Sequence, residues 1–248
     1  MADKNIQYYH FPEISSTNEK IKEILDSEKK VVVTAEYQTK GRGRLSRKWH
    51  GEPGENIYFS YGETHNGEVS FEKLSLYQAI GCLVVYDILS KLCPNEKFIT
   101  KYPNDILVKV EGIYKKICGI LVEHSFSGSF CQYSIIGIGI NVNQTSFPDE
   151  VKDIATSLNL LAYKYSTDEI IEKLLENILK YLSWEEKDLL KLWEERIAII
   201  GKEIRLVNRE EQWLVKSMLK DGRLEIENLS DHTKEILSDG ESIRYNYE

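Results

Sequence analysis

The 248-residue chain has little that would tie it to a metal, an oxidising compartment or a membrane. It has four cysteines without a C-x-x-C pair and five scattered histidines, so zinc-ligand spacing is absent. Its start, MADKNIQYYHF, is too polar for a signal peptide, and no apolar run reaches membrane-spanning length. These absences predict a cytoplasmic protein with reduced thiols that does not bind membranes.

Positive charge is also scarce, with 32 Lys and Arg against 40 Asp and Glu and a formal charge of −8. It is concentrated in KGRGRLSRK, residues 40–48, which holds five basic residues and no acid; without them 27 basic residues face 40 acids, leaving −13. Non-specific binding to a nucleic-acid backbone needs many exposed cations at once. One short basic loop on an acidic body therefore favours a small phosphorylated ligand.

The order of periodic segments predicts an α+β sheet domain. Ser16 and Glu19 have capping-box spacing at a helix start, and residues 70–92 have a broad apolar face. Residues 167–199 predict two amphipathic helices with a break near Ser183. Strands are predicted at 31–37, 56–61, 98–102, 106–110, 117–124 and 130–143, with hairpin turns at Glu111-Gly112 and Ser127-Gly128.

The pattern changes after Gly201. Short alternating strands at 203–207, 212–219, 223–228 and 235–245, with Asp-Gly pairs at 221–222 and 239–240, predict a small β-barrel. The predicted boundary lies near residue 199, between a domain of residues 1–199 and one of residues 200–248.

Two polar loops carry residues suited to an anionic ligand. In the basic loop, glycines permit close backbone approach, arginines match phosphate or carboxylate oxygens, and Trp49 could stack on a base. The loop matches neither G-x-G-x-x-G nor the P-loop. The segment 101–105, KYPND, brings a lysine, an amide and a carboxylate together. On its own this segment is more simply an ordinary turn, and the basic loop is equally compatible with a solvated loop.

Two predicted strands carry residues that are unusual for a core. In segment 115–123 a lysine enters an apolar strand, and Gly119 indicates a group passing close to the backbone. In segment 137–143 two glycines and Asn141 interrupt a run of Ile and Val. Either is compatible with packing alone, and together they indicate the floor of a pocket. Adjacent strand residues point to opposite faces, so only one of Lys115 and Lys116 can enter it.

Taken in order, these stretches resemble the biotin protein ligases, which attach biotin to biotin-dependent carboxylases. The G-R-G-R-x-x-R-x-W pattern is specific, as is its combination with K-x-P-N-D. Tyr102 stands where the family usually has tryptophan, and Cys118 where alanine is common. The blocks are 16–18, Gln38, 41–49, 101–105, 116–123 and 137–141, in the family's order over roughly residues 8–145.

The resemblance implies a fold and a set of partners. The expected fold is a class II synthetase-like mixed sheet flanked by helices, with an SH3-like C-terminal barrel. About seven residues precede the catalytic strand, so a short form is expected, without the N-terminal winged-helix domain through which some members repress transcription. The expected partner is a biotin carboxyl carrier domain of a carboxylase, with no DNA, and the chain is expected to be a monomer or homodimer.

The resemblance also implies an ATP-dependent, AMP-forming reaction. Biotin's carboxylate attacks the α-phosphate of ATP to give biotinyl-5'-AMP, and a lysine of the carrier domain then attacks this mixed anhydride. ATP and biotin are the substrates, and Mg²⁺ accompanies ATP. No covalent enzyme intermediate is needed.

Residue roles follow from the same resemblance. The catalytic residues are Lys116, which the family register selects over Lys115, and Arg47. The biotin-binding residues are Ser16, Thr17, Gln38, Gly41, Arg42, Lys116 and Gly119. The ATP-binding residues are Arg44, Arg47, Trp49, Asn104, Asp105 and Asn141, and the candidate metal ligands are Asp105 and Asn141.

Other functions stay open at this stage. A lipoate or octanoyl ligase or transferase has a similar fold, although the G-R-G-R-x-x-R-x-W loop argues against it. An RNA-binding module using the Arg/Gly loop belongs to another class, and the −13 remainder and lack of a second basic patch disfavour it. A biotin-sensing regulator is disfavoured by the missing DNA-binding domain.

Overall fold

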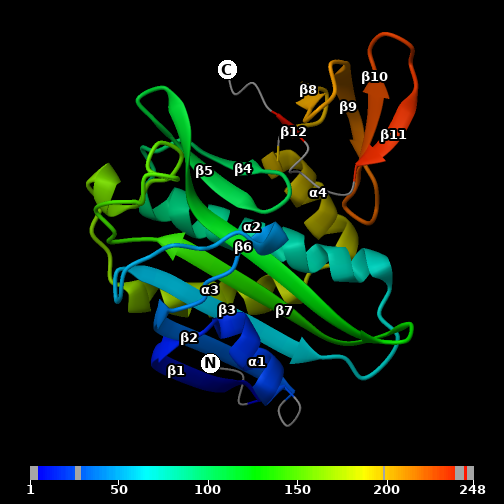
Figure 1. Ribbon diagram of the computed structural model, residues 1–248. Helices are drawn as coiled ribbons and strands as arrows, with labels where there is room; N and C mark the ends of the chain where they lie inside the picture. The colour runs from blue at the N-terminus through cyan, green and yellow to red at the C-terminus, as the bar shows by residue number, and fades with distance from the viewer. Residues whose placement is uncertain (1–4, 26–28, 198, 238–242, 245–248) are drawn as a thin grey trace.

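The computed structural model describes residues 5–25, 29–197, 199–237 and 243–244, and it contains two sheets (Figure 1). The larger sheet has seven strands in the order β1-β2-β3-β7-β6-β5-β4. The first two strands pair in parallel and all other neighbours are antiparallel, so the sheet is mixed. Its strands are β1 (Gln7–Ile14), β2 (Lys30–Gln38), β3 (Asn56–Thr64), β4 (Phe98–Lys101), β5 (Asp105–Val110), β6 (Ile113–Ser127) and β7 (Phe130–Asn141).

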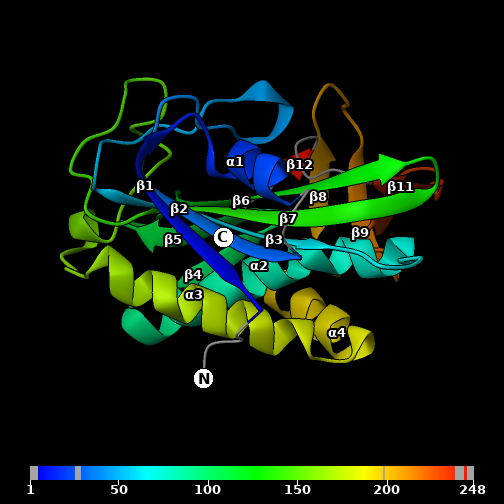
Figure 2. The ribbon, with the colours of Figure 1, turned by 90° about the horizontal axis from the view of Figure 1, so that it is seen from below.

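Helices cover both faces of the larger sheet (Figure 2). One face carries α1 (Thr17–Ile24), and the other carries α2 (Phe71–Leu92), α3 (Thr167–Leu182) and α4 (Glu186–Ile197). Because strand residues alternate between faces, Val31 and Val33 of β2 pack with Ile21 of α1, whereas Val32 joins the larger core formed with α2. The predicted α+β class, with helices flanking a mixed sheet, is confirmed.

Several predicted ends differ from the structure. β3 continues to Thr64 and β6 begins at Ile113, because both extend along paired neighbours beyond their apolar cores. Ser16 is the N-cap of α1, but its side chain makes no capping hydrogen bond, so the capping-box interpretation is wrong. The helix break is confirmed, since Ser183 is the C-cap of α3. Both predicted hairpin turns are present, with positive φ at Glu111, Gly112 and Gly128.

The second sheet is antiparallel, with strands in the order β11-β10-β9-β8-β12. This arrangement agrees with the predicted SH3-like barrel. The strand predicted over 235–245 is instead two strands, and the turn at Asp239-Gly240 lies outside the described residues. The strands are β8 (Glu203–Leu206), β9 (Gln212–Met218), β10 (Leu224–Asn228), β11 (Lys234–Leu237) and β12 (Ile243–Arg244).

The predicted domain boundary stays a prediction, and the order of elements agrees with it. The last helix packed on the larger sheet ends at Ile197, and the first strand of the second sheet begins at Glu203. Within the described segments, no helix combines the length and apolar character needed to cross a membrane. All four cysteines are buried and free.

Candidate active site

A pocket on the α1 face of the larger sheet collects side chains from segments far apart in the sequence. Nine of the thirteen predicted site residues line it, and they come from the start of α1, the end of β2, the basic loop, the β4–β5 turn and β6. The lining residues are Ser16, Thr17, Asn18, Gln38, Arg42, Gly43, Arg44, Trp49, Asn104, Lys116, Gly119, Ile120, Leu121, Gly137, Ile138 and Gly139.

Glycines form the floor because other side chains lie directly on them. A Cβ at Gly137 would come 2.3 Å from Asn18 Oδ1, and one at Gly139 would come 2.6 Å from Trp49 Cε2. A Cβ at Gly119 would come 2.8 Å from Trp49 Cζ3. Gly119 and Gly139 are direct partners in the β6–β7 ladder, so the indole of Trp49 lies across both. The close approach that the sequence indicated at Gly119 is therefore present.

The end of the pocket beside α1 is rich in uncharged hydrogen-bonding groups. Gln38 Oε1 accepts from Thr17 N at 2.7 Å and from Thr17 Oγ1 at 3.0 Å. Ser60 Oγ lies 2.7 Å from Thr17 Oγ1 and 2.6 Å from Asn18 Oδ1. Ser16, Thr17 and Asn18 are almost fully buried. Such preorganised hydroxyl and amide groups suit an uncharged polar group, which must find partners when it leaves water.

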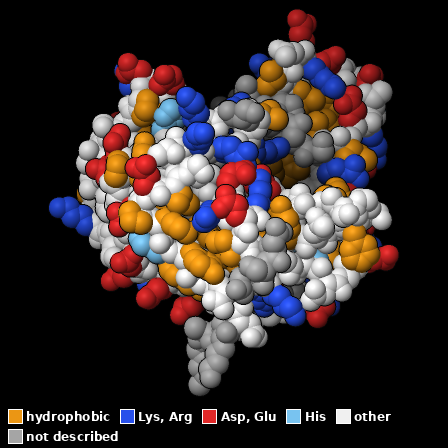
Figure 3. Space-filling view, turned by 60° about the horizontal axis from the view of Figure 1, so that its bottom comes forward, with side chains coloured by type: hydrophobic (Ala, Val, Ile, Leu, Met, Phe, Trp, Pro, Cys, Tyr) orange, Lys and Arg blue, Asp and Glu red, His pale blue; other side chains and the backbone are white. Residues whose placement is uncertain are grey.

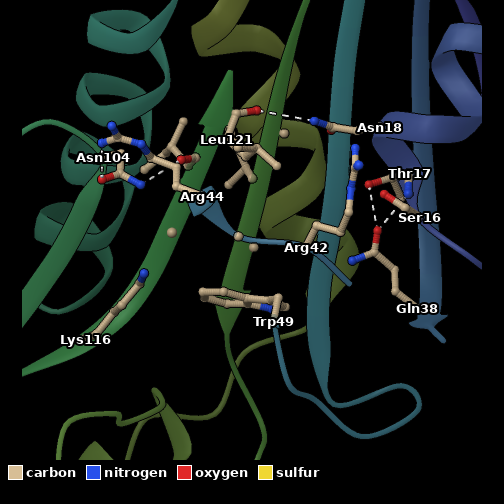
Figure 4. Close-up of a pocket in the computed structure, with 16 residues that line it drawn as sticks. Ser16, Thr17, Asn18, Gln38, Arg42, Arg44, Trp49, Asn104, Lys116 and Leu121 are labelled. Atoms are coloured by element: carbon tan, nitrogen blue, oxygen red, sulfur yellow. Dashed lines mark hydrogen bonds between the residues drawn. The ribbon is translucent and has the colours of Figure 1, made fainter. Parts of the chain in front are cut away.

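The opposite end is cationic. Lys116 Nζ pairs with Asp105 Oδ1 at 2.7 Å and lies 5.4 Å from the centre of the Trp49 ring. Arg44 Nη1 donates to Asn104 Oδ1 at 3.4 Å. Asn104 is fixed to β6 in turn, since its Nδ2 donates to Ile120 O at 3.1 Å and its O accepts from Ile120 N at 2.8 Å. Figure 4 shows Trp49 between this end and the Gln38 end.

A β-bulge explains why Lys116 and not Lys115 enters the pocket. The pairing of β6 with β5 skips Ile117, which is the extra residue of the bulge. A bulge changes the faces on which neighbouring side chains lie. Here it puts Lys116 on the same face as Gly119, three residues away, where regular alternation would separate them. Lys115 does not line the pocket.

Asn141 affects the pocket only indirectly, through its neighbours. It is 3% exposed and does not line the cavity. Its Nδ2 donates to Thr156 O at 2.9 Å. Lys116 is held by the same segment, because its N donates to Ile154 O at 2.7 Å and its O accepts from Thr156 N at 2.9 Å. Asn141 therefore supports the segment that fixes the Lys116 backbone, and its contact with ATP stays a prediction.

Three other predicted residues also lie outside the lining. The O atom of Gly41 accepts from Trp49 N at 3.0 Å, and a Cβ at Gly41 would come 2.7 Å from Trp49 O. Arg47 has an exposed side chain, and its O accepts from Gly43 N at 2.7 Å. Asp105 reaches the pocket through its ion pair with Lys116. Backbone contacts of Gly41 and Arg47 thus shape the loop that presents Trp49, and their ligand contacts stay predictions.

Arg42 lines the pocket, but two carboxylates hold its guanidinium. Arg42 Nη2 pairs with Glu19 Oε1 and lies 3.1 Å from Glu123 Oε1. Lys22 Nζ lies 2.9 Å from the same two oxygens. The hydrogen bond from Lys22, with the charges of Lys22 and Arg42, lowers the pKa of Glu19. Two cations and two anions therefore offset one another at the pocket rim.

The sequence analysis missed two polar side chains of the site: Asn18, which lines the pocket, and Glu123, which pairs with Arg42 at its rim. Besides Arg42, Glu123 contacts Asn18, whose Nδ2 donates to Glu123 Oε2 at 2.7 Å. The signal for Glu123 was strand alternation, because residues 119, 121 and 123 share a face of β6. Figure 3 shows Lys and Arg side chains gathered beside acidic ones near the middle of one face, so basic charge there is locally balanced.

The described residues contain no group of three or more His, Cys, Asp and Glu side chains that could hold a metal ion. Of the two candidate ligands, Asp105 is paired with Lys116, and Asn141 Oδ1 is buried with no hydrogen-bond partner in the described chain. One carboxylate and one amide oxygen suit Mg²⁺, which binds few protein groups when phosphate oxygens complete its shell.

The sequence model of the Biotin/lipoate A/B protein ligase family matches residues 10–141, the region that contains every residue lining the pocket. The chain belongs to this family. Bifunctional ligase/repressor BirA from Bacillus spizizenii is 33% identical over 201 residues, which are 77% of this chain and 60% of that protein. A biotin--[acetyl-CoA-carboxylase] ligase from Mycobacterium tuberculosis is 29% identical over 182 residues, 71% of this chain and 64% of that protein. The chain thus aligns with less than two thirds of the length of these relatives.

Solved structures of ligases share the whole fold of this family member. Biotin protein ligase from Aquifex aeolicus in complex with biotin and ATP matches with a TM-score of 0.71 and 28% identity, over 98% of this chain and 100% of that one. A biotin protein ligase from Leishmania major matches with a TM-score of 0.59 and 22% identity, over 96% of this chain, which supports the fold alone. This coverage includes the second sheet, so the C-terminal sheet belongs to the shared architecture.

Proposed function

We propose that this protein is an ATP-dependent ligase that converts biotin to biotinyl-5'-AMP and transfers it to a lysine of a biotin carboxyl carrier domain. The two-ended pocket carries this proposal. An uncharged polar end at Thr17 and Gln38 and a cationic end at Lys116 and Arg44 lie on either side of Trp49. Biotin has the matching shape, with a ureido ring at one end and a carboxylate at the other. The names of the related ligases agree with this substrate.

In the first step, a carboxylate oxygen of biotin forms a bond to the α-phosphorus of ATP. The bond from that phosphorus to the bridging oxygen breaks, and pyrophosphate leaves with the electron pair. Lys116 at the cationic end would reduce repulsion between the two anions and stabilise the charge that grows during transfer. Asp105 holds Lys116 by the 2.7 Å ion pair. Arg44, next to Asn104, would bind the phosphates, and Trp49 the adenine.

In the second step, the acceptor lysine amine attacks the acyl carbon of the mixed anhydride. The new C–N bond replaces the bond from the acyl carbon to the phosphate oxygen, AMP leaves, and the amine loses a proton to solvent. The chain needs no nucleophile of its own. Burial raises the pKa of Cys82 to about 12 and that of Cys118 well above its usual value, so neither thiol supplies a thiolate.

Mg²⁺ is part of the proposal and would enter with ATP. Asp105 and Asn141 are the protein groups that would hold it, and the bound ion would offset phosphate charge. We further propose that the enzyme works in the cytoplasm, because ATP is available there and its four cysteines are free.

The test is pyrophosphate release from purified protein with ATP and either biotin, lipoate or octanoate. The expected result is pyrophosphate release with biotin but not with lipoate or octanoate. It should be accompanied by biotinyl-5'-AMP in the mass spectrum and by labelling of an added carrier domain. Release with lipoate or octanoate in place of biotin would make the protein a lipoate or octanoyl ligase. No release with any acid, combined with tight and salt-sensitive RNA binding, would overturn the ligase proposal altogether.

A further inference from the structure

One buried hydrogen bond joins the second sheet to the cationic end of the pocket. Tyr102 immediately precedes the turn that carries Asn104 and Asp105, and it is 3% exposed. Its hydroxyl donates to the carbonyl of Gly222 at 3.1 Å, across 120 residues of sequence. Gly222 lies between β9 and β10 of the second sheet. A buried phenol requires an acceptor, and this acceptor comes from the other sheet.

The surroundings hold the acceptor in place. Gly222 has a φ of +76°, which suits glycine, and a Cβ there would lie 2.7 Å from Trp193 Cζ3 of α4. Trp193 is 2% exposed. Its ring stacks on that of Tyr102, with centroids 6.1 Å apart and planes inclined by 29°. Tyr102 is therefore restrained on one side by α4 and on another by the β9–β10 turn.

From Tyr102 the restraint continues along the turn into the pocket. Cys82 Sγ of α2 donates to the carbonyl of Pro103 at 3.2 Å. Asn104 makes two hydrogen bonds with Ile120 and accepts from Arg44, and the next residue, Asp105, pairs with Lys116. Tyr102, which contacts the second sheet, is thus two positions from Asn104 and three from Asp105, the residues that contact Arg44 and Lys116 at the cationic end.

We propose that Tyr102 is a positioning residue for the nucleotide: its hydroxyl couples the second sheet to the turn of Asn104 and Asp105, and thereby sets the affinity for ATP. The proposal rests on the proposed function, since that function names ATP as the ligand. The uncharged groups at Thr17 and Gln38 make their hydrogen bonds with one another and with Ser60 of β3, away from the turn of Asn104 and Asp105, so loss of the Tyr102 hydroxyl acts on ATP and spares biotin.

The test compares Tyr102→Phe with Tyr165→Phe. Tyr165 is a matched control outside the pocket, because its hydroxyl also donates to a backbone carbonyl, that of Leu92, at 2.5 Å. Each variant loses one phenol–carbonyl hydrogen bond and keeps the ring. Tyr102→Phe is expected to raise KM for ATP roughly five- to tenfold, the size of one net hydrogen bond, with KM for biotin and kcat within about twofold. Tyr165→Phe is expected to leave all three unchanged.

Amide hydrogen exchange gives a readout that is independent of activity. Asn104 N donates to Lys101 O, and Ile120 N donates to Asn104 O; both amides are expected to exchange faster in Tyr102→Phe and not in Tyr165→Phe. An unchanged KM for ATP in Tyr102→Phe would overturn the proposal, as would an equal rise of KM for ATP and biotin. If the wild-type protein forms no adenylate at all, the proposed function fails and the ATP claim with it. An active wild type with an unaffected Tyr102→Phe variant defeats the Tyr102 proposal alone.

Discussion

Replacing Lys116 by alanine is expected to slow adenylate formation far more than replacing Lys115. Lys116 lines the pocket and its Nζ pairs with Asp105 at 2.7 Å, whereas Lys115 lies outside the lining. Removing one preorganised group that stabilises charge developing in the transition state typically lowers the rate about 10²- to 10³-fold. The loss in Lys116→Ala is expected at the upper end of that range, because it also leaves the carboxylate of Asp105, only 18% exposed, without its partner beside two anionic substrates.

These two contributions can be separated. In Lys116→Ala/Asp105→Asn the unpaired negative charge is gone. If that charge adds about 1.4 kcal/mol to the activation free energy of adenylate formation, the double variant is expected to be roughly tenfold faster than Lys116→Ala alone. Such a result would show that the lysine acts partly by neutralising Asp105. A double variant slower than Lys116→Ala would mean that the proposed role of Asp105 in holding Mg²⁺ with ATP outweighs the repulsion from its unpaired charge.

The assay is single-turnover release of pyrophosphate with saturating biotin and ATP. Lys115→Ala is expected to stay within about twofold of the wild type, since its side chain makes no contribution to the pocket lining. Equal losses in the two single variants, or a larger loss in Lys115→Ala, would refute the assignment of Lys116. Circular dichroism of both variants controls for misfolding.

Four further predictions follow from other parts of the chain. Arg44→Gly loses the contact with Asn104. Loss of one charge-assisted hydrogen bond, worth about 1.5–3 kcal/mol, is expected to make the variant release adenylate roughly ten to a hundred times faster. The measurement is biotin labelling of serum albumin in the presence of ATP, and unlabelled albumin with continuing pyrophosphate release would contradict the prediction. Glu123→Gln removes the carboxylate that pairs with Arg42 and Lys22 at the pocket rim and is expected to raise KM for biotin severalfold with little change in KM for ATP. A rise in KM for ATP with KM for biotin unchanged would contradict it. Burial lowers the pKa of His124 from 6.5 to about 4, so between these pH values the unfolded chain binds a proton at this residue and the native chain does not. The melting temperature should therefore fall as the pH drops from 6.5 toward 4, and less steeply in His124→Gln. Equal slopes of melting temperature against pH in the two proteins would contradict this. A folded carrier domain should have a higher kcat/KM than a peptide around its lysine, because one lysine among many must be selected by a docked surface, and equal values would exclude such docking.

Local patterns in the sequence predicted the elements and the position of the pocket floor well. The β-branched run at 31–37 lies within β2, and the periodic segment at 70–92 matches α2 within one residue. Glycine at 119 indicated a close approach before the partner was known, and that partner is Trp49. These predictions succeed because the signal lies in neighbouring residues: side-chain branching, spacing and the lack of a Cβ act locally.

Interactions between distant segments were not predictable in this way. Arg42 is 81 residues from Glu123, and Tyr102 is 120 residues from Gly222, so no spacing rule connects them. The acceptor of the Tyr102 hydroxyl is a carbonyl of the second sheet, which only the fold brings near. The same limit applies to Ser16, where local spacing predicted a capping hydrogen bond that the side chain does not make; the residue lines the pocket instead.

The choice between Lys115 and Lys116 shows how a local rule can be overridden. Counting by twos from Gly119 on the pocket face leads through Ile117 to Lys115, so strand alternation alone selects the wrong lysine for the pocket. The structure reverses this parity with one unpaired residue, Ile117. Ile117 and Cys118 are both fully buried in the core cluster that contains α2, so two consecutive side chains face the core and the next one back, Lys116, turns to the pocket. Removing the bulge would send Lys116 into that core or move Ile117 out of it. Apolar burial of Ile117, worth about 1.5–3 kcal/mol for a side chain of that size, therefore stabilises the register that presents Lys116.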